Sequence, residues 1–413
     1  MAIHNPVLLT FCLLIAFVGA AAASLAITDR LISARLLLDR PNERSSHERE
    51  TPRSGGVAVF AAWAAAMIFC SLIYAPAGGL SVGGNGGVSP DEFIALAMTG
   101  LLAFALGLVD DHSNLAARRK LIYQVAAAAL FVLMFGAITA VPLPFFGSVA
   151  LGLFGPVLTV FWIVAFMNAF NFMDGLNGIA GLSAIVVAVA LALAAALAGA
   201  LVWAVAAGVL AAAIAGFAWR NYPSGAIFLG DSGSLFISYA IAGLAVLAAR
   251  AGAPAGQGDG LTILFVPIAF MPFLFDVAFT LAHRAWRKRP LTEAHRDHLY
   301  QLLSRDGVPA TVVTGLYAAL VAVSCVTAFA ADAMPADRQW IAPLLLAIAM
   351  MGPAIFIYRR ALARGLLIDR PHSEKPRRQR RRAHTVGDDA PLPTGSLYKG
   401  AESDVNAGVQ AAE

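Results

Sequence analysis

Apolar runs of about 18 to 22 residues recur along most of the chain, and they limit its possible folds more than any other feature. A helix of about 20 apolar residues spans the hydrocarbon core of a bilayer. The chain is 59% hydrophobic and 13% charged, whereas a soluble domain is about half apolar and a quarter charged. The sequence therefore predicts an all-α polytopic membrane protein and argues against one large soluble core.

We expect about eleven transmembrane helices. The first run has no basic residue before it, so it is interpreted as a retained span rather than a signal peptide. Two later runs meet at Gly199 with almost no connection, which predicts a tight turn there. The expected spans cover residues 6–27, 57–74, 92–109, 121–140, 150–167, 181–199, 201–218, 234–249, 261–282, 309–331 and 340–358.

Basic residues predict the orientation, because cytoplasmic loops retain Lys and Arg. The connections alternate between two sets, and of 29 basic residues only Arg250 and Arg338 fall in the second set. The basic set is then cytoplasmic, and an odd number of spans places the N-terminus outside and the C-terminus in the cytoplasm. The cytoplasmic connections are residues 28–56, 110–120, 168–180, 219–233 and 283–308.

These assignments divide the chain into two domains. Residues 1–358 form a transmembrane domain whose cytoplasmic loops carry the candidate site, and residues 359–413 form a basic cytoplasmic tail. We expect the tail to be disordered and its basic run at 377–382 to lie on anionic lipid.

Two adjacent carboxylates, Asp110 and Asp111, end the third span. A helix C-terminus is already negative, so such a pair is unfavourable unless a cation is near. The pair suits Mg²⁺ binding or general-base work on a phosphate. The alternative is a solvated helix end that is offset by Arg118, Arg119 and Lys120.

A glycine-rich segment with Asp231 precedes the eighth span. Gly230 and Gly233 permit close approach of a ligand, and one carboxylate beside a helix N-terminus can hold Mg²⁺ together with phosphate oxygens and water. Phe228 could stack on a base. The alternative for this segment is a helix start that Ser232 or Ser234 caps.

Amide side chains gather between the fifth and sixth spans, in the segment Asn168–Gly178. Asn171, Asp174 and Asn177 can read the polar edge of a base or a sugar. A plain helix–loop turn with caps is the alternative reading.

His295 and His298 lie three residues apart, so they would share one face of a helix. Zinc needs at least a third matched ligand, and we favour binding of phosphate or sugar hydroxyls together with Arg296. Asp276 lies within the ninth span, where an acid costs about 2.5–3.5 kcal/mol and marks either a site or a helix–helix bond. Arg53 ends a basic loop that could form a gate over an anionic substrate.

Four motifs follow one another along the chain: the Asp110–Asp111 pair, the segment Asn168–Gly178, the segment around Asp231 and the segment around His295 and His298. With these motifs in this order, the chain resembles the polyprenyl-phosphate N-acetylhexosamine-1-phosphate transferases, the family that contains the MraY and WecA enzymes. The resemblance covers about residues 30–305. The segment His295–Gln301 is similar to the histidine motif of the branch that primes O-antigen-type or capsular polysaccharides.

The resemblance implies a reaction at the cytoplasmic face of the bacterial inner membrane. A UDP-N-acetylamino sugar gives its sugar-1-phosphate to undecaprenyl phosphate, which yields undecaprenyl-pyrophosphoryl-sugar and UMP, the first membrane step of cell-envelope polysaccharide synthesis. Mg²⁺ is required, with Mn²⁺ as a substitute. The resemblance makes a homodimer plausible, and it implies no nucleic-acid partner.

The resemblance also implies roles for single residues. Asp110 and Asp111 correspond to the catalytic pair, and Asp231 to the magnesium ligand. Asn177 stands where many members have an aspartate, which weakens any metal role for this position. The substrate-binding positions are Arg53, Asn171, Asp174, Asn177, Phe228, His295, Arg296 and His298.

Other functions stay open on the sequence alone. A peptidoglycan-type phospho-MurNAc-pentapeptide transferase is one, although the run of three histidines of that branch is absent. A secondary transporter is another, but its polar residues would lie near the membrane midplane between repeated halves. A phosphatidyltransferase that acts on CDP-alcohols is a further alternative, but this chain lacks the aspartate motif of those enzymes. The sugar itself stays undetermined.

Overall fold

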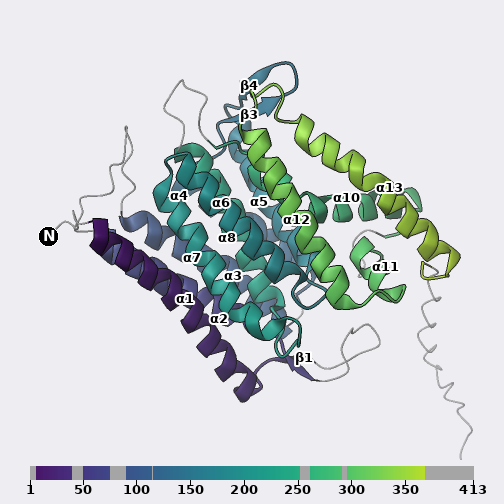
Figure 1. Ribbon diagram of the computed structural model, residues 1–413, viewed down its shortest axis with the longest axis horizontal. Helices are drawn as coiled ribbons and strands as arrows, with labels where there is room; N and C mark the ends of the chain where they lie inside the picture. Colours follow the sequence, from purple (N-terminus) through teal and green to yellow (C-terminus); the bar gives the residue numbers. More distant parts are fainter. Residues whose placement is uncertain are drawn as a thin grey trace, which may run out of the picture. The chain divides into compact units, whose positions relative to one another are not determined.

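The computed structural model describes residues 6–39, 50–74, 90–113, 115–251, 261–290 and 295–367. Helices dominate this part of the chain (Figure 1). The helices are α1 (Pro6–Ala34), α2 (Gly55–Tyr74), α3 (Pro90–Ser113), α4 (Ala117–Phe135), α5 (Phe154–Met173), α6 (Ile179–Leu197), α7 (Leu201–Asn221), α8 (Gly230–Ala251), α9 (Phe265–Ala269), α10 (Met271–Trp286), α11 (Leu299–Arg305), α12 (Ala310–Asp332) and α13 (Ile341–Ala363).

Nine helices of the described part are long and apolar enough to cross a membrane, so the prediction of a helical multi-pass membrane protein is confirmed. The expected spans 121–140 and 261–282 are not among the nine. α4 carries three basic residues in its first turn, and the second of these spans is broken at Phe270 into α9 and α10. The count of eleven and the orientation stay predictions.

Several helices extend beyond the apolar runs. α3 continues to Ser113, α5 to Met173 and α13 to Ala363, and α8 begins at Gly230. The prediction that the residues around Asp110, Asn171 and Asp231 lie in loops is therefore wrong. The helices extend past the apolar runs because these polar side chains form hydrogen bonds and ion pairs with neighbouring helices. The tail from residue 368 onward lies outside the described residues.

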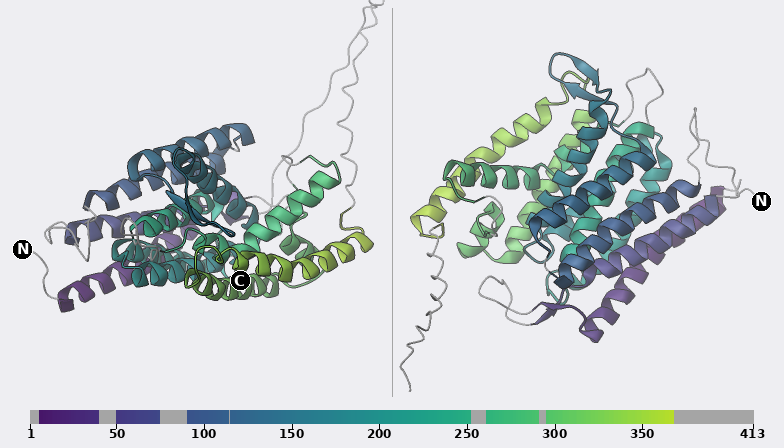
Figure 2. Two further views of the ribbon diagram at one scale, coloured as in Figure 1. Left: turned by 90° about the horizontal axis from the view of Figure 1, so that it is seen from above. Right: turned by 180° about the vertical axis from the view of Figure 1, so that it is seen from behind.

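α8 lies at the centre of the helical bundle. Its residues from Ser232 to Ala248 are all buried, and α2, α3, α5 and α7 pack around it (Figures 1 and 2). Glycines permit the close approach at its first turn. A Cβ atom on Gly107 of α3 would lie 2.2 Å from the Asp231 carbonyl oxygen, and one on Gly56 of α2 would lie 2.1 Å from the Gly233 nitrogen. Three helices thus meet at the start of α8.

Two short antiparallel hairpins interrupt the all-α architecture. β3 (Ala140–Leu143) pairs with β4 (Gly147–Ala150) between α4 and α5. β1 (Leu38–Asp39) pairs with β2 (Thr51–Pro52) after α1. The expected tight turn at Gly199 is confirmed by its φ of +78° between α6 and α7.

The hairpin of β1 and β2 lies against the segment that leads into α8. The Phe228 N–H donates to the Pro52 carbonyl at 2.7 Å, and the Gly55 and Gly56 N–H groups donate to the carbonyls of Phe228 and Leu229. This backbone ladder holds Arg53 beside the first turn of α8.

Candidate active site

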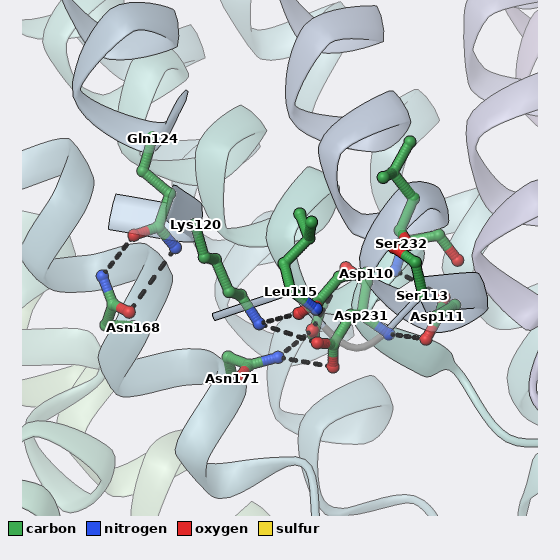
Figure 3. Close-up of polar contacts among 12 residues, drawn as sticks. Asp110, Asp111, Ser113, Leu115, Lys120, Gln124, Asn168, Asn171, Asp231 and Ser232 are labelled. Atoms are coloured by element: carbon green, nitrogen blue, oxygen red, sulfur yellow. Dashed lines mark hydrogen bonds and ion pairs between the residues drawn. The ribbon is translucent and has the colours of Figure 1, made fainter. Parts of the chain in front are cut away.

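Polar side chains from four helices meet at one end of the bundle (Figure 3). α3 and α5 end there, and α4 and α8 begin there. The site therefore combines two negative helix C-termini with two positive N-termini. The segments that the sequence analysis expected on one face do converge in space.

Asp111 connects α3 to α8. Its Oδ1 accepts the Asp231 N–H at 2.8 Å, and its Oδ2 accepts the Ser232 N–H at 2.9 Å. Arg53 lies 3.0 Å from Oδ1, and the Asp111 side chain is 0% exposed. The carboxylate satisfies the free N–H groups at the start of α8, so both of its oxygens are occupied.

Asp110 and Asp231 share one cation. Lys120 Nζ lies 2.7 Å from Asp110 Oδ2 and 2.7 Å from Asp231 Oδ2. The remaining oxygen of Asp110 accepts the Leu115 N–H at 2.7 Å. The position of Lys120 at the centre of the site was not predicted from the sequence, where its only expected role was to offset the charge of a solvated helix end.

Asn171 reaches Asp231 from the last turn of α5. Its Nδ2 donates to Asp231 Oδ1 at 3.0 Å and to Ser234 Oγ at 2.7 Å. Farther along the same helices, Asn168 of α5 donates to Gln124 of α4 at 2.8 Å (Figure 3). Lys120 and Gln124 are four residues apart and therefore share one face of α4. This spacing is a signal in the sequence that both side chains point toward the same neighbours.

Asp174 caps the end of α5 and is half-buried. Burial raises the pKa of this carboxyl well above its usual value, and the negative charges of Asp231 and Asp111 raise it further against the opposing effect of Arg53. Its side chain has no hydrogen bond or ion pair with the residues that the structure describes. It is therefore the one carboxyl of this group without such a partner among the described residues.

The charges of this group do not balance. Among the described residues, Asp110, Asp111 and Asp231 contact two cations, Arg53 and Lys120, and Asp174 adds a fourth carboxyl whose raised pKa favours its neutral form. Among the described residues, no three acidic, histidine or cysteine side chains are arranged as a metal site. Mg²⁺, however, commonly takes one or two carboxylates and completes its shell with water and phosphate oxygens. Asp231, which is 23% exposed, and the Asn171 amide beside it fit such a partial shell.

Residues 295–301, here called the histidine loop, are held in place by Asp276 of α10, which is 0% exposed. This carboxylate accepts the Leu299 and Tyr300 N–H groups at 2.9 and 3.2 Å and the Tyr317 hydroxyl at 2.6 Å. His298 Nδ1 lies 3.2 Å from it. Asp276 therefore accepts hydrogen bonds from the start of α11 and contacts the ring of His298.

Tyr300 joins this loop to the end of α5. Its hydroxyl donates to the Phe172 carbonyl at 3.0 Å, and a Cβ atom on Gly175 would lie only 2.1 Å from that hydroxyl. The His298 and Phe172 rings are 5.9 Å apart. The histidine loop therefore packs against the segment that carries Asn171 and Asp174.

The other expected binding residues lie around these two groups. Burial, with Arg284 and His298 nearby, lowers the pKa of His295 to about 4 although Asp297 and Asp276 oppose this. The Asn177 side chain packs against Gly225. Arg296 is half-buried, and its carbonyl accepts a bond from Arg305. Phe228 is held by its backbone, as described above, and its ring is half-buried.

Comparison with known proteins adds independent evidence. Residues 93–249 match the family described as glycosyl transferase family 4. An undecaprenyl-phosphate alpha-N-acetylglucosaminyl 1-phosphate transferase of Escherichia coli (strain K12) is 27% identical over 359 residues, which is 84% of this chain and 89% of the relative.

Two further relatives have related names. A Bacillus subtilis (strain 168) protein named a probable undecaprenyl-phosphate N-acetylglucosaminyl 1-phosphate transferase is 28% identical over 66% of this chain and 70% of its own length. The decaprenyl-phosphate N-acetylglucosaminephosphotransferase of Mycobacterium tuberculosis (strain ATCC 25618 / H37Rv) is 29% identical over 67% and 72%. The matched region contains the acidic and amide motifs that meet in the site, and residues 93–249 belong to glycosyl transferase family 4.

Proposed function

We propose that this protein transfers an N-acetylamino-sugar-1-phosphate from a UDP-sugar to undecaprenyl phosphate and releases UMP. The observation that carries the proposal is the acidic group around Asp231, which Lys120 and Asn171 contact at one end of the bundle. The names of the relatives support this substrate pair, and N-acetylglucosamine is the sugar to test first. We place the reaction at the cytoplasmic face of the bacterial inner membrane.

The charges of the site and of the substrates are the reason to propose a divalent ion here. Both substrates are phosphate anions, and among the described residues Asp110, Asp111 and Asp231 already engage the two nearby cations, Arg53 and Lys120. Without a further positive charge the site would repel its substrates. Mg²⁺ bound through Asp231 would supply that charge and stabilise the leaving UMP.

The residues of the chain then have distinct tasks. Asp110 lies beside Lys120 at the edge of the group, where it can orient the phosphate of the lipid or accept a proton from it. Asp111 positions the start of α8 and with it Asp231. Attack of one phosphate oxygen on another phosphorus depends mainly on orientation and charge neutralisation.

The histidine loop suits the sugar and phosphate of the donor. His298 is held by Asp276, and Arg296 brings a permanent positive charge to the same loop. The half-buried Asp174 and Asn177 offer polar groups to the nucleotide. The packing of Tyr300 on Gly175 keeps the two binding segments at a fixed separation.

A direct assay tests this proposal. Purified full-length protein is given undecaprenyl phosphate, Mg²⁺ and separate UDP-sugars, and UMP release is measured. We expect turnover with a UDP-N-acetylamino sugar, loss of turnover in EDTA, and loss in Asp231→Asn with the protein still monodisperse. Turnover only with UDP-MurNAc-pentapeptide would identify the peptidoglycan branch. A transporter would release no UMP with any donor.

A further inference from the structure

Lys120 occupies the space between two carboxylates on which the proposed reaction depends. Its ammonium group lies 2.7 Å from Asp110 Oδ2 and equally close to Asp231 Oδ2. Its neighbours Arg118 and Arg119 in the first turn of α4 are exposed, whereas Lys120 is only 14% exposed. One basic residue of the three thus turns into the site (Figure 3).

The oxygens that face Lys120 are those which a metal ion would need. Asp231 Oδ1 accepts the bond from Asn171, and Asp110 Oδ1 accepts the bond from Leu115. Mg²⁺ binds oxygen at about 2.0–2.1 Å, so an ion on Asp231 Oδ2 would lie within about 5 Å of the Lys120 ammonium. Two cations so close in a half-buried site repel each other strongly. The metal ion and the Lys120 ammonium therefore cannot both contact Asp231 Oδ2 closely at the same time.

A lysine is suited to yield its place. Its charge lies at the end of a flexible four-carbon chain, and the ammonium is a compact donor that binds phosphate as a point charge. Both substrates of the proposed reaction bring phosphate to this group of residues. A displaced Lys120 therefore has a new anionic partner within the reach of its own side chain.

We propose that Lys120 is a counter-ion that exchanges with the divalent cation. In the metal-free protein its ammonium forms ion pairs with both Asp110 and Asp231. Metal binding at Asp231 displaces it, and the released ammonium then binds a substrate phosphate. This inference rests on the proposed function, and it gives Lys120 opposite effects on two measurements: it weakens metal binding and supports turnover.

The test measures metal affinity separately from activity. Mn²⁺ binding to purified full-length protein without substrates is followed through the electron paramagnetic resonance signal of the free ion. We expect Lys120→Met to bind Mn²⁺ at least about tenfold more tightly than the unchanged protein, since a competing cation is gone. The matched control, Arg118→Met, removes an exposed charge of the same turn and should change the affinity less than about twofold.

Turnover provides the second readout. At saturating Mn²⁺, UMP release by Lys120→Met should fall at least about tenfold, and Lys120→Arg, which keeps the charge, should recover part of it. Lys120→Gln repeats the affinity measurement if the methionine variant does not fold. A lysine with only a structural role would lower both affinity and turnover when it is replaced.

The outcomes separate the inference from the proposed function. Equal or weaker Mn²⁺ binding in both neutral Lys120 variants overturns the exchange, whereas the reaction itself stands if the unchanged protein still releases UMP. Absence of Mn²⁺ binding to the unchanged protein overturns the exchange as well, and the UMP assay in EDTA then decides whether the proposed reaction needs a metal.

Discussion

The acidic pair at the end of α3 shows how two adjacent residues of the same type acquire different tasks. Asp110 shares Lys120 with Asp231, whereas Asp111 accepts two backbone N–H groups of α8 and an ion pair from Arg53. The pair itself could be predicted from the sequence because two carboxylates at a helix C-terminus require cations. Which of the two caps α8 depends on the close approach of α3 and α8 at Gly107, and no local pattern encodes it.

This difference predicts unequal effects on stability. Asp110→Asn and Asp111→Asn should both abolish UMP release, but Asp111→Asn should also lower the free energy of unfolding by about 2 kcal/mol. One buried N–H group then loses a charged acceptor, and Arg53 loses the closer of its two carboxylate partners. Thermal midpoints of the purified variants, measured beside UMP release, check this.

Asp110→Asn serves as the matched variant in that comparison, since Lys120 keeps Asp231 as a partner there. Equal thermal midpoints for the two variants would show that Asp111 does not hold the start of α8.

At the scale of elements, the apolar runs predict that helices exist but not where they end. Residues 168–173 are polar enough to suggest a loop, yet α5 continues to Met173 because Asn168 and Asn171 find partners on α4 and α8. The break between α9 and α10 has a visible signal in Pro272, which cannot supply a backbone N–H near the start of α10. The two hairpins are too short and too weakly patterned to predict.

The contacts of Asp276 predict that this buried acid fixes the position of the binding loop around His298. Asp276→Leu would leave the N–H groups of Leu299 and Tyr300 and the hydroxyl of Tyr317 without an acceptor. Each such buried group costs about 1–3 kcal/mol. We expect a lower thermal midpoint and a higher KM for the UDP-sugar, measured by UMP release at varied donor concentration.

Two companion variants make the Asp276 result specific. Asp276→Asn keeps an acceptor oxygen and should recover part of the donor affinity. Thr280→Val removes a hydroxyl that contacts Asp276 from the same helix at 3.2 Å, and it should leave the KM nearly unchanged. An unaltered KM in Asp276→Leu, with only the stability lowered, would limit Asp276 to packing.

At the scale of the whole molecule, the site depends on all four motifs lying on one side of the bilayer. The structure brings the ends of α3 and α5 to the starts of α4 and α8, so these segments share one end of the bundle whichever way the protein faces. Their convergence was predicted from charge segregation alone, because alternate connections carry nearly all the basic residues. The same segregation predicts that this end faces the cytoplasm.

Cysteine labelling measures that orientation. Ser224, between α7 and α8, is exposed at the end that holds the site, and Ser148, in β4, is exposed at the opposite end. In a background without Cys12, Cys70 and Cys325, an impermeant maleimide should label Ser148→Cys in intact spheroplasts and Ser224→Cys only after lysis. The hairpin that contains Ser148 follows α4, whose basic first turn the positive-inside rule holds in the cytoplasm. Labelling of Ser224→Cys in intact spheroplasts would place the carboxylates outside, where the UDP-sugar is not supplied.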